Sequence, residues 1–290
     1  MEDGTYILWP MSIREDADGD AAAEVRFNDR FLDRFIELVP LAHALERCLE
    51  CELLAAQPFV HPVLDLGCGD GTFAKVLFAQ PIELGLDPDQ RELDLAQATG
   101  AYRRLVRASG DSIPEPDGSF GTVFSNSVLE HIRDLPPVLK EINRVLSSDG
   151  RLYVTVPTDV IERVNLGRVI LRWFGPRVEG SFQRTFRRVW RLHNVHPPQV
   201  WAQLFADAGF AVEESVRYQS LRMYRTREVA LPFSLPAWVL KRTRNRWLIS
   251  PVWFRRFLIA PVARALRRFG EPITGARAGG LLLLGLRKIQ

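Results

Sequence analysis

The residues best suited to chemistry form a glycine-rich turn after a short apolar run. Gly67, Gly69 and Gly71 separate that run from the start of a predicted helix, within the sequence VLDLGCGDGTFA. Glycines permit positive φ and let a ligand touch the backbone. The first N–H groups of a helix attract carboxylates or phosphates. A turn of this kind by itself does not distinguish a nucleotide site from a tight bend.

A carboxylate stands at the end of the next apolar run. Asp87 follows Gly67 by 20 residues and directly precedes Pro88. In open parallel sheets, an acidic side chain in this place accepts hydrogen bonds from ribose hydroxyls. The alternative is that Asp87 is only a turn residue before Pro88. The glycines upstream favour the ribose role.

Two more polar segments follow later apolar runs. Gly110–Ile113 reads GDSI, and Ser125–Ile132 reads SNSVLEHI. Ligands of open parallel sheets bind beyond the carboxyl ends of the strands. We therefore expect both segments to lie at the same edge of the sheet as the glycine turn and Asp87.

The elements that must position these residues alternate between strand and helix. Apolar runs predict strands at His61–Leu66, Ile82–Leu86, Arg104–Ala108, Gly121–Ser125, Arg151–Val156, Phe210–Tyr218 and Gly280–Lys288. Helices are predicted at Thr72–Ala79, Gln90–Ala98, Pro137–Leu146 and Pro198–Ala208. This alternation predicts an α/β fold with a doubly wound, mostly parallel sheet.

A longer helical pattern precedes the first strand. It runs from Asp29 to Leu54, with Asn28 as its predicted N-cap. Pro40 is expected to kink or divide it. Cys48 and Cys51 fall within the pattern, and no second pair exists to complete a zinc site. We interpret both cysteines as structural.

The three motifs together resemble class I S-adenosylmethionine-dependent methyltransferases, in the broad group that includes ubiquinone- and menaquinone-type methyltransferases. The resemblance covers about residues 61–157, a third of the chain. The segments that carry it are VLDLGCGDGTFA, GDSIPEPDGSF and SNSVLEHI, extended by EINRVLSSDGRLYVTVP. In the last segment, Ser148-Asp149-Gly150 replaces the usual Pro-Gly-Gly, a departure confined to a turn.

The resemblance implies S-adenosylmethionine as cofactor and a Rossmann-like sheet of seven strands, one of them antiparallel. Gly280–Lys288 fits that strand. The cofactor-binding residues that it implies are Asp65, Gly67, Cys68, Gly69, Gly71, Asp87, Pro88, Asp111, Ser112, Ile113, Ser125 and Asn126. Among these, Asp65 would lie near the ammonium group, Asp111 at the adenine amino group, and Ser125 and Asn126 near the methyl group.

A nicotinamide-dependent oxidoreductase is the competing interpretation. Its fingerprint is Gly-x-Gly-x-x-Gly, whereas this chain has glycines at 67, 69 and 71 and Phe73-Ala74 near the place of the third glycine. The spacing favours the methyl donor.

Three histidines are candidate catalytic bases. Methyl transfer depends mostly on alignment, and a base is needed only for a hydroxyl or carbon acid acceptor. His131 belongs to the SNSVLEHI segment, where it could equally order the loop. His193 and His196 open the helix after the fifth strand. His-x-x-His without a third ligand is poor evidence for a metal, so we predict no metal site.

Charge is divided unevenly along the chain. Residues 1–60 contain 5 Lys/Arg and 13 Asp/Glu, residues 61–160 contain 9 and 15, and residues 161–290 contain 24 and 7. Residues 222–268 alone contain 12 Lys/Arg and one acid, Glu228. Aromatic and aliphatic residues interleave with these bases: Phe233, Trp238, Trp247, Leu248, Ile249, Trp253, Phe254, Phe257, Leu258 and Ile259.

This basic, aromatic-rich pattern suits segments that lie in an anionic membrane interface. The alternatives are a helical lid or dimer arm packed on the sheet, and contact with nucleic acid. No nucleic-acid methyltransferase motif supports the last, because the strand-four segment lacks Asn-Pro-Pro-Tyr.

Three regions follow from these observations. Residues 1–60 are expected to form an acidic leader and N-terminal helix, residues 61–220 and 279–290 a methyltransferase core, and residues 221–278 a basic helical insertion. The expected function is methyl transfer to a small-molecule or lipid-linked acceptor near the cytoplasmic membrane surface. A non-catalytic cofactor-binding or membrane-docked partner protein and an RNA methyltransferase remain alternatives.

The expected location is the cytoplasm, peripherally on the inner face of the cell membrane. The N-terminus shows no basic region followed by an apolar run, so no secretory signal is visible. No stretch of about 18 uninterrupted apolar residues occurs.

Overall fold

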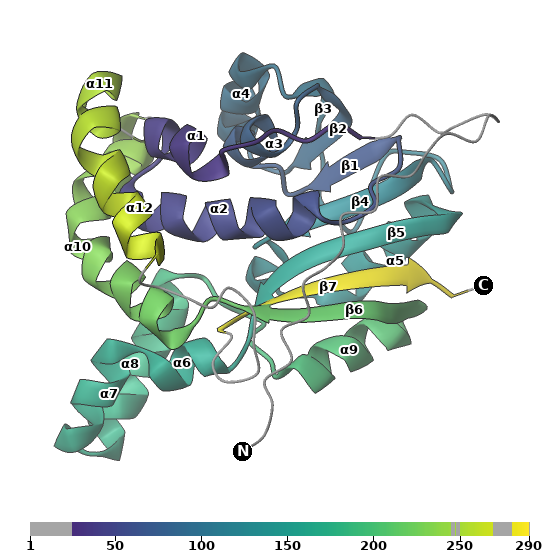
Figure 1. Ribbon diagram of the computed structural model, residues 1–290. Coiled ribbons are helices and arrows are strands. Elements are labelled where there is room, and N and C mark those ends of the chain that lie inside the picture. Colours follow the sequence, from purple (N-terminus) through teal and green to yellow (C-terminus); the bar gives the residue numbers. More distant parts are fainter. Residues whose placement is uncertain (1–24, 245–246, 248–249, 269–279, 290) are drawn as a thin grey trace, which may run out of the picture.

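Seven strands of the described residues form one sheet in the order β3-β2-β1-β4-β5-β7-β6 (Figure 1). This computed structural model describes residues 25–244, 247, 250–268 and 280–289. The strands are β1 Val63–Leu66, β2 Ile82–Asp87, β3 Tyr102–Arg107, β4 Phe120–Asn126, β5 Leu146–Pro157, β6 Phe210–Tyr218 and β7 Leu281–Lys288. Strand β7 runs antiparallel to β5 and β6, and the pairs formed by β1 to β5 are parallel.

The predicted fold class is therefore confirmed, including the antiparallel strand at the end of the chain. The observed β5 begins five residues before the predicted one, because Leu146 pairs with Phe120 of β4 across an irregularity in register. Strand β3 begins two residues early, at Tyr102.

Helices cover both faces of the sheet and divide the core into two apolar clusters. On one face, Phe35, Leu45 and Leu77 from α1 Phe31–Leu38, α2 Leu41–Ala55 and α3 Thr72–Leu77 pack with Phe124 of β4. On the other face, α5 Leu135–Val145 and α9 Pro198–Asp207 pack on β1, β4, β5 and β7. Helix α4 Gln90–Thr99 lies beside β3. Strand β1, buried along its whole length, holds the bend that follows it rigidly.

The N-terminal helical pattern is divided at Pro40, as predicted. Pro40 has extended backbone angles between α1 and α2, since its ring cannot continue a helix. The predicted cap at Asn28 is wrong. Its side-chain amide instead donates to the carbonyls of Val76 and Phe78, at 2.8 and 2.6 Å. Those carbonyls end α3 and lack helical partners, so they attract the amide.

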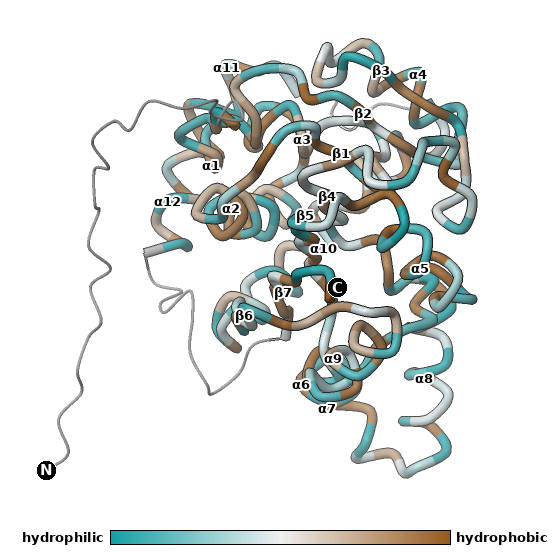
Figure 2. Tube along the Cα trace, turned by 90° about the vertical axis from the view of Figure 1, so that its right-hand side faces the viewer, coloured by the Kyte–Doolittle hydropathy of each residue, from teal (hydrophilic) through white to brown (hydrophobic). Residues whose placement is uncertain are grey.

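Two helical additions stand at one side of the sheet. After β5 come α6 Val160–Val164, α7 Leu166–Leu171, the 3-10 turn η2 Arg172–Phe174 and α8 Pro176–Val189. Helices α7 and α8 extend away from the sheet in both Figure 1 and Figure 2. The second addition comprises α10 Leu221–Arg244, α11 Val252–Phe254, the π-helical turn η3 Arg255–Ile259 and α12 Ala260–Arg268.

The second addition packs against the N-terminal helices, with α10 beside α2 and α12 beside α1. Arg255 is buried and donates to the carbonyl of Glu37 at the end of α1. Within the described part of the chain, no helix combines the length and the apolar character needed to cross a bilayer. Residues 1–24 of the expected leader region, and residues 245–246, 248–249 and 269–278 of the expected insertion, lie outside the described residues.

Candidate cofactor and acceptor site

The bend after β1 approaches its neighbours too closely for side chains. Gly67 has φ +79°, and a Cβ there would lie 2.5 Å from Cγ1 of Val128. Gly69 has φ +51°, and no heavy atom lies within 4 Å of the position that its Cβ would take. At Gly67 the bend therefore packs tightly against Val128, in the loop after β4. At Gly69 the bend is open, so a ligand can reach the backbone there.

The Asp87 carboxylate lies directly against this bend. Its Oδ2 accepts a hydrogen bond from the N–H of Gly69 at 2.9 Å, and its Oδ1 accepts from the N–H of Asp89 at 2.9 Å. Each carboxylate oxygen has a second lone pair, so both can still accept hydroxyl groups. An open glycine beside a fixed pair of acceptors fits a ribose, and these residues therefore fit the cofactor implied by the sequence.

Asp65 lies beneath the bend, buried at the end of β1. Its Oδ2 accepts a hydrogen bond from the Tyr102 hydroxyl at 2.7 Å. Burial raises the pKa of Asp65 to about 7, against the lowering effect of Tyr102. A nearby cation would favour the ionised carboxylate, so the environment suits the ammonium contact predicted for this residue.

The other predicted cofactor residues lie at the same edge of the sheet. Asp111 and Ser112 are exposed in the loop after β3, whereas Ile113 is buried. At the end of β4, the Ser125 hydroxyl donates to the carbonyl of Leu66 at 3.0 Å. The Asn126 amide donates to Glu50 on α2. These bonds tie the end of β4 to β1 and α2, and the cofactor roles of the four polar residues stay predictions.

Lys241 of α10 and Trp247, which follows that helix, contact the bend at Asp70. Oδ2 of Asp70 accepts from Lys241 Nζ at 2.8 Å and from Trp247 Nε1 at 2.7 Å, and Oδ1 accepts from the N–H of Thr72. Burial by itself would raise the pKa of Asp70. The Lys241 charge and these hydrogen bonds together lower the pKa by more than burial raises it, so the net shift is downward. Because Asp70 already occupies the first N–H of the six-residue α3, that helix end is less available to a ligand than predicted.

A cavity of about 260 Å³ opens beside the bend, near the carboxyl ends of β4 and β5. It adjoins the bend in two places. Ser127, which lines it, precedes the Val128 that packs on Gly67. The His43 ring, also in the lining, lies 5.2 Å from the Trp247 ring that bonds Asp70. A molecule in this cavity would therefore lie next to a ligand held at the bend.

The cavity walls are mixed in character. The apolar part consists of Ala42, Pro157, Ile161, Phe186, Trp190, Leu192, Leu231 and Leu281. The polar part consists of His43, Glu46, Arg47, Ser127, Glu130, His131, Asn165, Tyr224, Arg227 and Glu228. Such a lining suits an amphipathic molecule rather than a wholly apolar one.

Four buried polar atoms in this lining have no hydrogen-bond partner in the described structure. They are Nδ1 of His43, Oε2 of Glu130, Nε of Arg227 and Oε2 of Glu228. Buried polar atoms in native proteins are nearly always bonded. Their convergence on one cavity indicates a site that a ligand completes.

Burial also shifts the protonation of these groups. It raises the pKa of Glu130 to about 8 and lowers the pKa of His43 to about 3. It lowers the pKa of Arg227 to about 10. Strong shifts of this kind at a cavity are typical of functional sites. A glutamate that titrates near pH 8 can hold a proton in the physiological range.

The structure brings one of the three candidate histidines to the cavity. His131 lines it, and its Nδ1 bonds the carbonyl of Arg191 at 3.2 Å. Burial lowers its pKa. His193 lies outside the cavity, in a neighbouring basic pocket, while the His196 ring packs edge-on against Trp201 at 5.3 Å. Of the three, His131 alone lines this cavity.

Sequence reasoning missed the charged residues of α2 and α10. Arg47 donates to Glu50 at 2.6 Å and to the Ser127 hydroxyl at 2.9 Å, and so joins α2 to the strand-four loop. The available signal was a pair of charges on the apolar face of a helix, where charges are buried only when paired. Glu130 lay within the SNSVLEHI segment but was not singled out.

Residues 64–154 match the protein family described as Methyltransferase domain. An uncharacterized methyltransferase of Mycobacterium sp. (strain JLS) is 40% identical over 89 residues, which is 30% of this chain and 35% of that protein. A malonyl-[acyl-carrier protein] O-methyltransferase of Legionella pneumophila is 35% identical over 99 residues, 32% of this chain and 35% of that protein. The match spans about a third of the length of these curated relatives.

Solved structures agree on the fold. A Thermotoga maritima SAM-dependent methyltransferase aligns with a TM-score of 0.53 at 18% identity, covering 86% of this chain and 91% of that one. A Haloferax volcanii methyltransferase, solved with the Trm112 activator, aligns with a TM-score of 0.53 at 17% identity, covering 91% and 99%. Residues 64–154 thus match a methyltransferase domain, and the sheet as a whole has the fold of the aligned methyltransferase structures.

Proposed function

We propose that the protein transfers a methyl group from S-adenosylmethionine to an amphipathic small-molecule or lipid-linked acceptor. The observation that carries the proposal is the juxtaposition of two sites. A carboxylate-bearing, open bend at Gly69 and Asp87 adjoins a cavity that contains the unpartnered oxygen of Glu130. A non-catalytic cofactor-binding protein would not need the second site.

When bound, S-adenosylmethionine supplies an electrophilic methyl carbon with a neutral leaving group. The chain's own residues hold and orient the two reactants. Asp87 and Gly69 fix the donor side, and the apolar wall of Ile161, Phe186 and Trp190 excludes water from the acceptor. Alignment of this kind accounts for most of the acceleration expected in methyl transfer.

In its ionised form, Glu130 is placed to accept a proton from the acceptor. Its Oε2 is buried and unpartnered at the cavity, and its raised pKa lies near the working pH, which is where a general base is most effective. The cavity therefore suits an acceptor whose nucleophile carries a removable proton, such as a hydroxyl. His131, which lines the same cavity, is the alternative base.

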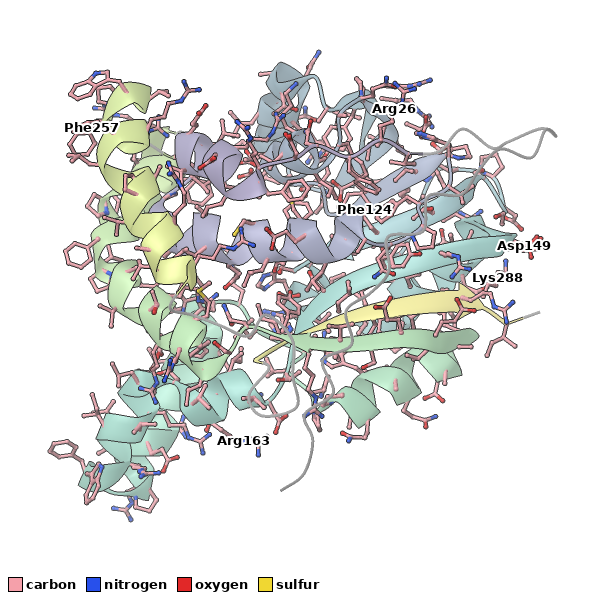
Figure 3. All side chains as sticks on the ribbon, in the orientation of Figure 1. Arg26, Phe124, Asp149, Arg163, Phe257 and Lys288 are labelled. Carbon is pink, nitrogen blue, oxygen red and sulfur yellow. The ribbon has the colours of Figure 1, made fainter. Side chains whose placement is uncertain are left out.

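A peripheral position on the inner face of the cell membrane is also part of the proposal. Phe233 of α10, Trp253 of α11 and Phe257 of η3 have exposed fractions of 84%, 68% and 74%. Figure 3 shows Phe257 pointing away from the body of the molecule. Large exposed aromatic side chains on a basic segment support an interfacial position.

The surface proposed to face the membrane includes fewer residues than the sequence predicted. Trp247 turns inward to bond Asp70, and Ile259 packs against the core. Arg255 is buried against α1. Leu248 and Ile249 lie outside the described residues. The exposed aromatic residues on α10 to η3 are the ones to test.

Binding to vesicles tests the membrane proposal. Phe233→Ser with Phe257→Ser should reduce cosedimentation with phosphatidylglycerol vesicles at low salt, because both side chains are exposed. Val178→Ser with Val189→Ser, exposed on α8, is the matched control. If the wild type ignores the vesicles, or both double variants bind like it, the membrane proposal is refuted.

Label transfer tests the enzymatic proposal. The wild type is incubated with methyl-labelled S-adenosylmethionine and separate lipid, small-molecule and RNA extracts, beside Asp87→Ala and Glu130→Gln. We expect label in the lipid or small-molecule fraction, lost with Asp87→Ala and strongly reduced with Glu130→Gln. Label in the RNA fraction alone would contradict the acceptor class. Absence of label from every fraction would contradict the enzymatic function.

A further inference from the structure

A second pocket, lined by basic residues, lies beside the acceptor cavity. It measures about 550 Å³ and is lined by Arg133, Arg187, Arg188, Arg191, Leu192 and His193. No acidic residue lines it. The sequence interpretation considered His193 only as a base, and the site described above does not use the arginines.

Three of the four arginines are electrostatically uncompensated within the described part of the chain. Arg187 donates two hydrogen bonds to the Glu162 carboxylate, one from Nη2 at 2.9 Å and one from Nε. Arg133, Arg188 and Arg191 are exposed and have no carboxylate partner among the described residues. Unpaired guanidinium groups that share a concave surface attract a multiply charged anion, since each can donate two parallel hydrogen bonds to phosphate oxygens.

The backbone at Arg191 adds a second observation. Arg191 has φ +51°, a left-handed conformation that favours glycine at the end of a helix. A residue with a Cβ is strained in this conformation. The turn is held by the N–H of Leu192, which donates to the carbonyl of Arg187, and by His131, which bonds the carbonyl of Arg191. The chain thus keeps a cation at this position at a cost in stability.

The two pockets share a wall. Leu192 lines both, and His131 joins them by bonding Arg191 from within the cavity. The last turns of α8 supply both kinds of contact, because Phe186 and Trp190 face the cavity whereas Arg187 and Arg188 face the basic pocket. An elongated molecule could place an apolar part in the cavity and an anionic part among the arginines.

We propose that the pocket of Arg133, Arg188 and Arg191 binds a phosphate group carried by the methyl acceptor. The acceptor would then be a phosphorylated amphiphile. This inference rests on the proposed function for the role of the ligand, but phosphate binding can be measured without methyl transfer. The phosphate could belong to a free metabolite or to a lipid headgroup, and the test separates the two.

The binding test uses the full chain and a matched pair of double variants. Arg188→Ala with Arg191→Ala removes two pocket cations. Arg177→Ala with Arg184→Ala removes two exposed cations of α8 that lie outside the pocket. Arg187 is left in place because its bonds to Glu162 hold α8 on α6. Calorimetric binding of S-adenosylmethionine checks that every variant is folded.

Two probes distinguish the sources of phosphate. Inorganic pyrophosphate stands for a free phosphorylated metabolite, and phosphatidylglycerol vesicles, compared with phosphatidylcholine vesicles, stand for a lipid headgroup. We expect the pocket variant to weaken binding of at least one probe about tenfold or more, because two charge-assisted hydrogen-bonding groups are lost. The control variant should stay within about twofold of the wild type. Equal losses in both variants, or no saturable binding of either probe by the wild type, would overturn the proposal.

The acceptor itself gives the last readout. Phosphatase treatment of the extract fraction that accepts the methyl label should abolish labelling by the wild type. Labelling that survives the phosphatase sinks the inference and leaves the proposed methyl transfer intact. The protein could instead bind phosphate through the pocket and yet label no fraction. That result would support the phosphate pocket and contradict the proposed methyl transfer.

Discussion

Substitution of Glu130 by glutamine should change how stability depends on pH. Burial raises the pKa of the Glu130 carboxyl to about 8, from a model-compound value of 4.5. Between these values, the folded chain keeps a proton that the unfolded chain releases. The contribution of Glu130 to the free energy of unfolding therefore falls as the pH rises from 4.5 to 8. Glutamine has nearly the same shape and does not titrate.

The size of the effect follows from the shift. One pKa unit corresponds to about 1.4 kcal/mol, so a shift from 4.5 to about 8 amounts to on the order of 5 kcal/mol. Asp65 is shifted in the same direction, from 3.8 to about 7. Because Asp65 is present in both proteins, its contribution cancels in their difference. Glu130→Gln should thus become steadily more stable relative to the wild type as the pH rises.

Urea unfolding followed by tryptophan fluorescence at pH 5, 6, 7, 8 and 9 measures this difference. Asp149→Asn, which removes an exposed carboxyl from β5, is the control and should follow the wild type. A difference between Glu130→Gln and the wild type that stays constant from pH 5 to 9 would refute the reasoning. Glu130 would then be unprotonated in the folded chain and could not have the environment described.

Three further substitutions test other parts of the structure. Tyr102→Phe removes the hydrogen bond to buried Asp65. It should lower the free energy of unfolding by about 1–3 kcal/mol, measured by urea unfolding at pH 8, and an unchanged value would contradict this bond. Lys241→Ala breaks the contact of α10 with Asp70. It should speed proteolytic cleavage within α10 and weaken cofactor affinity, and an unchanged cleavage rate would contradict this contact. Phe205 is fully buried between α9 and the sheet. Phe205→Ala should lower the free energy of unfolding by about 3–5 kcal/mol, and a decrease under about 1 kcal/mol would show that α9 is not packed as described.

The parallel strands and their helices could be predicted because local sequence determines them. Apolar runs ending in glycine or aspartate mark β1 and β2, and their observed limits differ from the predicted ones by one or two residues. Pro40 divides the N-terminal helices for a reason that lies within the proline itself. Asp87 meets Gly69 because adjacent parallel strands end at the same edge.

The cavity proposed for the acceptor could not be predicted, because residues distant in sequence form it. His43 and Arg47 on α2 meet Glu130 after β4 and Arg227 on α10, and no local pattern specifies that meeting. The two tryptophans at 247 and 253 illustrate the same limit. They occupy similar basic surroundings in the sequence, yet Trp247 bonds Asp70 and Trp253 is exposed. Tertiary packing decides which of them covers the site.

Calorimetric titration with S-adenosylmethionine tests the central claim most directly, since everything proposed for the acceptor depends on a donor held at the bend. The wild type should bind one equivalent per chain, and Asp87→Ala should weaken that binding at least about tenfold, as expected for loss of charge-assisted hydrogen bonds to two hydroxyls. Absence of binding by the wild type, or equal affinity in a folded Asp87→Ala variant, would contradict the assignment.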